Sequence, residues 1–100
     1  MKFKKNNETI IIDIGESFKF SFYKEFRAAY ENLDIKTNKI TIDLNDTKFI
    51  DSSALGMLLQ MKESLSANDS FIKIINCNPD IYHLLCYCKF NTLFDISSKE

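Results

Sequence analysis

The segment best suited to chemistry runs from Phe49 to Gly56 and reads Phe-Ile-Asp-Ser-Ser-Ala-Leu-Gly. It places one carboxylate, Asp51, beside two hydroxyls, Ser52 and Ser53, at the predicted start of a helix. The first N–H groups of a helix lack internal partners and carry partial positive charge, so a phosphoryl group is stabilised there. A hydroxyl at this place could accept a phosphoryl group, gaining roughly −1.5 to −2 charge, without unfolding the helix. Alternatively, Asp51 and Ser52 are only helix caps, and spacing alone favours this reading.

A second chemically capable group lies near the C-terminus and consists of Cys77, His83, Cys86 and Cys88. Together they resemble a set of four zinc ligands. If one helix runs through them, however, Cys86 and Cys88 project about 200° apart and cannot share one ion. We therefore expect reduced thiols, no metal and no cofactor, with His83 on a helix surface.

The same histidine is the only partner available for a Ser-His-Asp hydrolase with Ser52 and Asp51. The Gly-x-Ser-x-Gly elbow is absent, and an aspartate adjacent to the nucleophile cannot also orient a distant imidazole. The two glycines stand alone, so no phosphate-binding glycine loop is present either. These observations predict that the protein is not an enzyme.

Composition limits the architecture further. One hundred residues suffice for one domain, residues 1–100. A net charge of −1 argues against nucleic-acid binding, which depends on neutralising phosphates. No apolar run approaches the length of about 20 residues that spans a bilayer, and the N-terminus does not read as a signal peptide. We expect a cytoplasmic protein that is not bound to a membrane.

The elements that must position the Asp51 segment alternate between strands and helices. Alternating or β-branched apolar residues predict strands at Phe3 to Lys5, Thr9 to Ile14, Ile40 to Leu44, Phe71 to Ile75 and Leu93 to Ile96. Apolar residues at helical spacing predict three helices. The first is capped by Ser21 and carries Phe22, Phe26, Ala29, Tyr30 and Leu33, and the second runs from Ser53 to about Ser66. The third follows Asn78-Pro79 and carries Ile81, Leu84, Leu85 and Cys88. Residues 97–100 are expected to be a tail. This order predicts an α/β fold, a mixed, mostly parallel sheet with right-handed βα crossovers and helices packed on it.

The helix after Asp51 has a predicted core face formed by Leu55, Leu58, Leu59 and Leu65. Met57 then falls on the solvent side, where its flexible side chain would suit a partner-binding surface. Met61 falls at the edge of the core face and is expected to be half-buried.

The stretch from Ile42-Asp43-Leu44 to Asp51-Ser52-Ser53-Ala54-Leu55-Gly56 resembles the central motif of STAS domains, the bacterial anti-sigma factor antagonists. That motif is a hydrophobic strand, a short loop and Asp-Ser-Ser-Gly-Leu-Gly at a helix start. Gly15, Asn76 and the Phe90 to Ile96 segment extend the likeness over nearly the whole chain. Residues 18–30 resemble a stand-alone subgroup associated with response regulators. Two residues depart from the family's pattern. Ala54 stands where the motif more commonly has glycine, and Lys19 stands where the subgroup is expected to have an acidic residue.

This resemblance implies a phosphorylation switch. The acceptor would be Ser52, modified by an anti-sigma factor or serine kinase of the histidine-kinase-like ATPase type. A PP2C-type phosphatase, or a response regulator carrying one, would remove the phosphate. Ser53 would be structural or a lesser site, and Asp51 would shape the site and assist recognition by the kinase. Together with Met57, whose place on the helical wheel suggests it, these two residues are expected to contact the partner.

Two other readings remain open. The chain could be a STAS accessory subunit of a lipid-transport ATPase, which binds without a phosphorylation cycle. It could also be a small-ligand module that senses nucleotides. An exposed sheet edge at Phe3 to Lys5 would in addition permit a homodimer.

Overall fold

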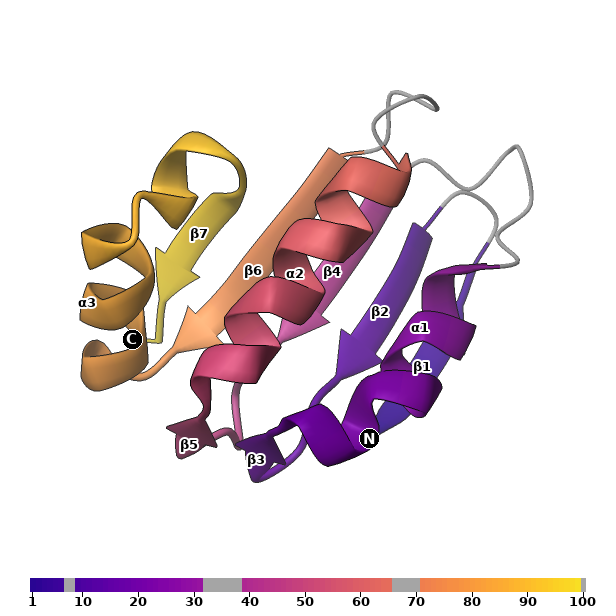
Figure 1. Cartoon of the computed structure of the whole chain (residues 1–100), viewed down its shortest axis with the longest axis horizontal. Coiled ribbons are helices and arrows are strands. Elements are labelled where there is room, and N and C mark those ends of the chain that lie inside the picture. The colour runs from indigo at the N-terminus through magenta and orange to yellow at the C-terminus, as the bar shows by residue number, and fades with distance from the viewer. Residues whose placement is uncertain (7–8, 32–38, 66–70, 100) are drawn as a thin grey trace.

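The computed structural model describes residues 1–6, 9–31, 39–65 and 71–99. Within them, five strands form one sheet in the order β1-β2-β4-β6-β7 (Figure 1). The strands are β1 (Lys2–Lys5), β2 (Thr9–Asp13), β4 (Lys39–Asp43), β6 (Phe71–Cys77) and β7 (Asp95–Ser98). Only β1 pairs antiparallel, with β2, and the other neighbours are parallel. The expected α/β fold with a mixed, mostly parallel sheet is confirmed.

One face of the sheet carries the core. Isoleucines stand in register across three neighbouring strands and are buried: Ile10, Ile12, Ile40, Ile42, Ile72 and Ile74. Helices α1 (Tyr23–Glu31) and α2 (Ser52–Leu65) lie across the sheet, with α2 over β4 and β6 (Figure 1). The alternate strand residues, such as Thr41 and Lys73, are half-buried or exposed, so the helices cover one face of the strands.

The start of the first helix differs from its prediction. A short 3-10 helix, η1 (Phe20–Phe22), precedes α1, and Lys19 flanks it without a side-chain cap. The predicted Ser21 cap is therefore wrong, because the chain enters the helix through a tighter turn. The apolar stripe is confirmed at Phe26, Ala29 and Tyr30, which are buried. The last member of the predicted stripe, residue 33, lies outside the described residues.

The third helix, α3 (Pro79–Tyr87), begins as predicted, since the Asn78 side chain accepts a hydrogen bond from the Ile81 N–H at 2.8 Å. Ile81 and Leu85 are buried, but Leu84 is 37% exposed and Cys88 is also exposed. The helix ends at Tyr87, so the stripe does not continue to Cys88.

The C-terminal segment also departs from the prediction. Residues 90–92 form a 3-10 helix, which delays the last strand to Asp95–Ser98. Ser98 pairs with Cys77, and the Lys99 N–H donates to the Cys77 carbonyl at 2.7 Å. Residues 97 and 98 of the predicted tail therefore belong to the sheet, and residue 100 lies outside the described residues. The backbone pairing of this segment with β6 does not depend on an apolar side-chain pattern, which is why Ser97 and Ser98 gave no signal.

Candidate functional site

A two-stranded sheet holds the turn that leads into α2. It pairs β3 (Ser17–Phe18) with β5 (Phe49–Ile50) in parallel, and the Asp51 N–H donates to the Phe18 carbonyl at 3.1 Å. Each strand has two residues, too few to give a periodic pattern, so neither was predicted. The pairing fixes the point at which the chain turns into the helix.

Asp51 caps α2 and also reaches back to the segment before α1. Its Oδ1 atom accepts from the Ala54 N–H at 2.8 Å, which confirms the predicted N-cap. Its Oδ2 atom accepts from the Phe20 N–H at 3.4 Å. The carboxylate is thereby held between two segments that are distant in sequence.

Ser52 and Ser53 are the first two residues of α2, and both are exposed. Among the described residues, neither hydroxyl group takes part in a hydrogen bond. Both therefore stand open to solvent where the helix N-terminus favours negative charge. An exposed hydroxyl at this place is chemically able to accept a phosphoryl group.

Met57 does not lie on the solvent side, so that prediction is wrong. It is 3% exposed, Met61 is fully buried rather than half-buried, and Leu59 is 42% exposed. The core face of α2 is formed by Ala54, Met57, Leu58, Met61 and Leu65. The four leucines shifted the predicted face, because alanine and methionine weigh less in a hydropathy pattern than leucine does.

A surface hollow of about 430 Å³ lies between η1, α1 and α2, and Ser53 is one of the residues that line it. We call it the Tyr23 hollow. It is lined by Phe20, Tyr23, Ser53, Gly56, Met57 and Gln60. Met57 thus contributes to the surface through this hollow while remaining almost fully buried. No local pattern in the sequence predicts the hollow, because it lies between elements far apart in the chain.

Aromatic stacking forms one wall of the Tyr23 hollow. The Phe20 and Tyr23 rings lie nearly parallel, at 8°, with centroids 5.5 Å apart. The Tyr23 hydroxyl accepts a hydrogen bond of 2.7 Å from Arg27 Nη1, and this bond lowers the pKa of Tyr23. Phe20 remains 59% exposed. The wall is therefore ordered but still presents an aromatic side chain to solvent.

Comparison with known proteins shows the family to which this chain belongs. The sequence model of the STAS domain matches residues 1–100. The chain belongs to the STAS domain family. A STAS-domain containing protein of Pseudomonas aeruginosa is 34% identical over 92 residues, which are 92% of this chain and 91% of that protein.

Several solved structures share the fold at low sequence identity. The unphosphorylated anti-sigma factor antagonist SpoIIAA matches with a TM-score of 0.80 and 16% identity, over 98% of this chain and 88% of that one. SpoIIAA of Bacillus in its phosphorylated form matches with a TM-score of 0.75 and 17% identity, over 98% of this chain and 91% of that one. A sulfate transporter family protein of Wolinella succinogenes matches with a TM-score of 0.80 and 14% identity, over 92% of this chain and 78% of that one.

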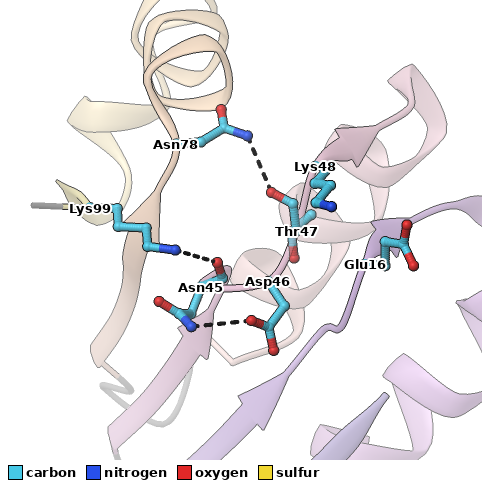
Figure 2. A pocket seen from close by; sticks show the side chains of 7 residues that line it. All are labelled: Glu16, Asn45, Asp46, Thr47, Lys48, Asn78 and Lys99. Carbon is cyan, nitrogen blue, oxygen red and sulfur yellow. Dashed lines mark hydrogen bonds between the residues drawn. The ribbon is translucent and has the colours of Figure 1, made fainter.

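A second depression of about 390 Å³ lies at the carboxyl ends of the parallel strands of this STAS domain (Figure 2). We call it the Asn78 pocket. It is lined by Glu16, Asn45, Asp46, Thr47, Lys48, Asn78 and Lys99. Asn78 Nδ2 donates to the Thr47 carbonyl at 3.2 Å, and Lys99 Nζ donates to the Asn45 carbonyl at 3.1 Å. These bonds brace the loop that precedes β5, and therefore the approach to Asp51.

The cysteines and the histidine of the STAS domain lie apart from this site. His83 is exposed on α3, as predicted, and its ring contacts Tyr82. All three cysteines are free, and burial raises the pKa of Cys77 to about 11. Within residues 1–6, 9–31, 39–65 and 71–99, no three His, Cys, Asp or Glu side chains gather as metal ligands would.

None of the helices in the described ranges has the length and apolar character needed to cross a membrane.

Proposed function

We propose that this STAS protein is an anti-sigma factor antagonist-type regulator, a partner-binding switch controlled by reversible phosphorylation of Ser52. The observation that carries the proposal is the exposed Ser52 hydroxyl at the first position of α2, directly after the Asp51 cap. In this proposal the chain is not an enzyme and acts in the cytoplasm.

The electrostatics of the turn support such a switch. A phosphoryl group on Ser52 would add roughly −1.5 to −2 charge where the helix terminus is partly positive, so the domain should stay folded. The same dianion would lie next to the Asp51 carboxylate and would be expensive to desolvate in an interface. Phosphorylation should thus expel a partner without refolding the domain.

The proposed partners are those that the resemblance to anti-sigma factor antagonists implies. A serine kinase of the histidine-kinase-like ATPase type would modify Ser52, and the unmodified protein would bind that kinase or another target. A PP2C-type phosphatase, or a response regulator carrying one, would restore the hydroxyl. SpoIIAA, which shares the fold, is known in unphosphorylated and phosphorylated forms, and this supports the proposal.

The test uses the purified kinase and ATP with the wild type, Ser52→Ala and Ser53→Ala. Phosphopeptide mass spectrometry should find modification at Ser52 in the wild type and in Ser53→Ala, and none in Ser52→Ala. Ser53→Ala is the matched control, since it removes a neighbouring exposed hydroxyl from the same helix turn. Modification confined to Ser53 would show that the wrong hydroxyl was chosen.

A second candidate function is a STAS module bound to a membrane transporter, such as an accessory subunit of a lipid-transport ATPase. The fold likeness to the Wolinella sulfate transporter family protein favours it. A pulldown with purified protein separates the two, because a soluble kinase supports the switch and a transporter ATPase supports this alternative.

A further inference from the structure

We infer that the sheet face opposite the helices binds a second copy of this chain, face to face and with the strands antiparallel. The inference goes beyond the proposed function and does not depend on it. It rests on the order of charged and apolar side chains along β4 and β6, and on two neighbouring carboxylates that make no ion pair within the described residues.

The uncovered face is formed by the strand residues that alternate with the buried isoleucines. On β4 these are Lys39, Thr41 and Asp43, since the two residues between them are buried on the helix side. Helices α1 and α2 lie on that helix side (Figure 1), and Ile81 and Leu85 of α3 belong to the same buried core. No described helix therefore covers the opposite face.

Charge changes sign along β4, the central strand of this face. Lys39 begins the strand and Asp43 ends it. Lys39 is exposed and makes no ion pair within the described residues. The Oδ1 atom of Asp43 accepts from the Asn45 N–H at 2.9 Å and from Asn76 Nδ2 at 3.0 Å. The Asp43 carboxylate is therefore fixed in place, but it pairs with no cation among the described residues.

A second carboxylate lies beside Asp43. Asp13 of β2 stands in register with it on the neighbouring parallel strand, and like charges at neighbouring positions of a sheet repel each other. Asp13 accepts the Gly15 N–H at 3.1 Å, and Lys2 stands across from it on β1 without forming an ion pair in the described part of the chain. A cation from another molecule would relieve the repulsion between the two aspartates.

The charges of the whole face are nearly balanced, which indicates the kind of partner. By strand register the face carries four lysines and three aspartates: Lys2, Lys4, Lys39, Lys73, Asp13, Asp43 and Asp95. Lys73 stands in register with Asp95, and β1 with its lysines is the edge of the sheet. A balanced surface complements a copy of itself better than it complements a polyanion, which requires an excess of cations.

Only one two-fold arrangement of the two faces joins opposite charges. With the two-fold axis along β4, Lys39 would lie against Lys39 of the second copy, and the aspartates would also meet. With the axis across the strands at Thr41, Lys39 lies against Asp43 of the second copy. Because a two-fold interface is self-complementary, that contact then occurs twice.

The neighbouring strand matches under the same operation. On β6, Phe71 stands in register with Lys39, and Ile75 stands in register with Asp43. The antiparallel overlap therefore sets Phe71, which is 50% exposed, against the half-buried Ile75 of the second copy. A hollow of about 470 Å³, lined in part by Lys39 and Phe71, leaves room for that side chain. Sheets that pack in this way lie about 10 Å apart with their strands nearly aligned.

The size of the face predicts a weak, reversible dimer. Five strands about 4.8 Å apart, with about five residues each, give a face of about 24 by 17 Å. Such an area lies at the small end of specific interfaces, so the order of charges must set the orientation. Since α2 lies on the other side of the sheet, both Ser52 hydroxyls would face outward in the dimer.

The test is sedimentation equilibrium of the full chain between about 10 μM and 1 mM. Lys39→Glu should raise the dissociation constant of the dimer at least about tenfold, because it turns two attractions into two repulsions. Thr41→Lys should have a similar effect, because it places two cations at the centre of the interface. The matched control is Lys24→Glu, which makes the same charge change at an exposed position of α1 and should dimerise as the wild type does.

A mixing experiment tests the antiparallel orientation. Asp43→Lys alone should also be monomeric, because its new cation would meet Lys39. An equimolar mixture of Lys39→Glu and Asp43→Lys should dimerise within about threefold of the wild-type dissociation constant, since every contact again joins opposite charges. Circular dichroism first checks that Asp43→Lys is folded, because Asp43 accepts hydrogen bonds in its own chain. Lys39→Glu and Thr41→Lys test the face without that variant.

Loss of the dimer in Lys39→Glu and Thr41→Lys, with recovery in the mixture, supports the inference. A wild type that stays monomeric up to about 1 mM overturns it. A dimer that survives both substitutions uses another surface, such as the β1 edge, and also overturns it. If both charge variants are folded and their mixture stays monomeric, the antiparallel arrangement is wrong and the inference fails. None of these outcomes depends on whether Ser52 is phosphorylated, so the proposed function is tested separately.

Discussion

The backbone N–H of Phe20 donates a 3.4 Å hydrogen bond to Asp51, which lies 31 residues later in the chain. Because the other oxygen of that carboxylate caps α2 at the Ala54 N–H, one side chain joins the aromatic wall of the Tyr23 hollow to the helix that begins with Ser52. The same residue thus holds the turn that carries the proposed acceptor and the wall of the Tyr23 hollow.

Asp51→Ala should lower the free energy of unfolding by about 1 to 2 kcal/mol, since it removes the N-cap and leaves the Ala54 N–H without its side-chain acceptor. Asp51→Asn keeps the capping oxygen and loses only the acceptor of the long, exposed bond from the Phe20 N–H, so it should stay within about 0.5 kcal/mol of the wild type. Urea unfolding followed by circular dichroism compares the two. Equal losses in both variants would mean that the charge, not the cap, stabilises this turn.

Leu58→Ala should be severely destabilising. Leu58 is 1% exposed between α2 and the sheet, and deleting buried methylene and methyl groups costs about 2 to 5 kcal/mol. Phe26→Ala should cost a similar amount, since Phe26 is also 1% exposed. Leu59→Ala, at an exposed position on the same helix, is the control and should change stability by about 0.5 kcal/mol or less. A thermal melt in which Leu59→Ala loses more than Leu58→Ala would contradict the observed face of α2.

Thr47→Val should destabilise the loop before β5. Thr47 is 2% exposed, and its Oγ1 atom donates to the Gly15 carbonyl, so valine would leave that acceptor without its partner. The expected loss is about 1 to 2 kcal/mol. Thr92→Val is the control, because Thr92 makes the same kind of bond, to the Lys89 carbonyl, in an exposed segment. Equal losses from the two substitutions would show that burial of Thr47 adds nothing.

Stability should fall in alkaline solution partly through Cys77. Burial raises its pKa from the ordinary value of 9.0 to about 11, so the unfolded thiol ionises at a pH where the folded thiol is still neutral. This contribution is complete below pH 9 and is lost as pH rises to about 11. Urea unfolding between pH 8 and pH 11 should show a shallower decline for Cys77→Ala. Tyr30, whose pKa is raised by burial, remains in both proteins, so the difference between them isolates the thiol. Parallel curves for the two proteins would contradict the prediction.

The sequence predicted the sheet well because burial on one face leaves a periodic record. Ile40, Ile42 and Leu44 alternate with polar residues and are all buried. The N-caps at Asp51 and Asn78 were predictable for a similar reason, since each depends on contacts within four residues. Local chemistry therefore identified both the fold and the turn that carries Ser52.

Features set by tertiary contacts could not be predicted in this way. The phase of α2 depends on what packs beneath it, so Met57 and Leu59 were placed on the wrong sides. The short β3–β5 pairing and the bond between Phe20 and Asp51 join residues about 30 positions apart and have no local pattern. The Tyr23 hollow follows from those same contacts.

The most direct test of the phosphorylation switch is partner affinity measured before and after incubation with the kinase and ATP, with the modified residue identified by mass spectrometry. The wild type and Ser53→Ala should gain one phosphoryl group on Ser52 and release the partner. Ser52→Ala should stay unmodified and bind throughout, because losing its hydroxyl leaves the Asp51 cap in place. If no serine is modified and all three proteins bind alike before and after ATP, the switch is contradicted.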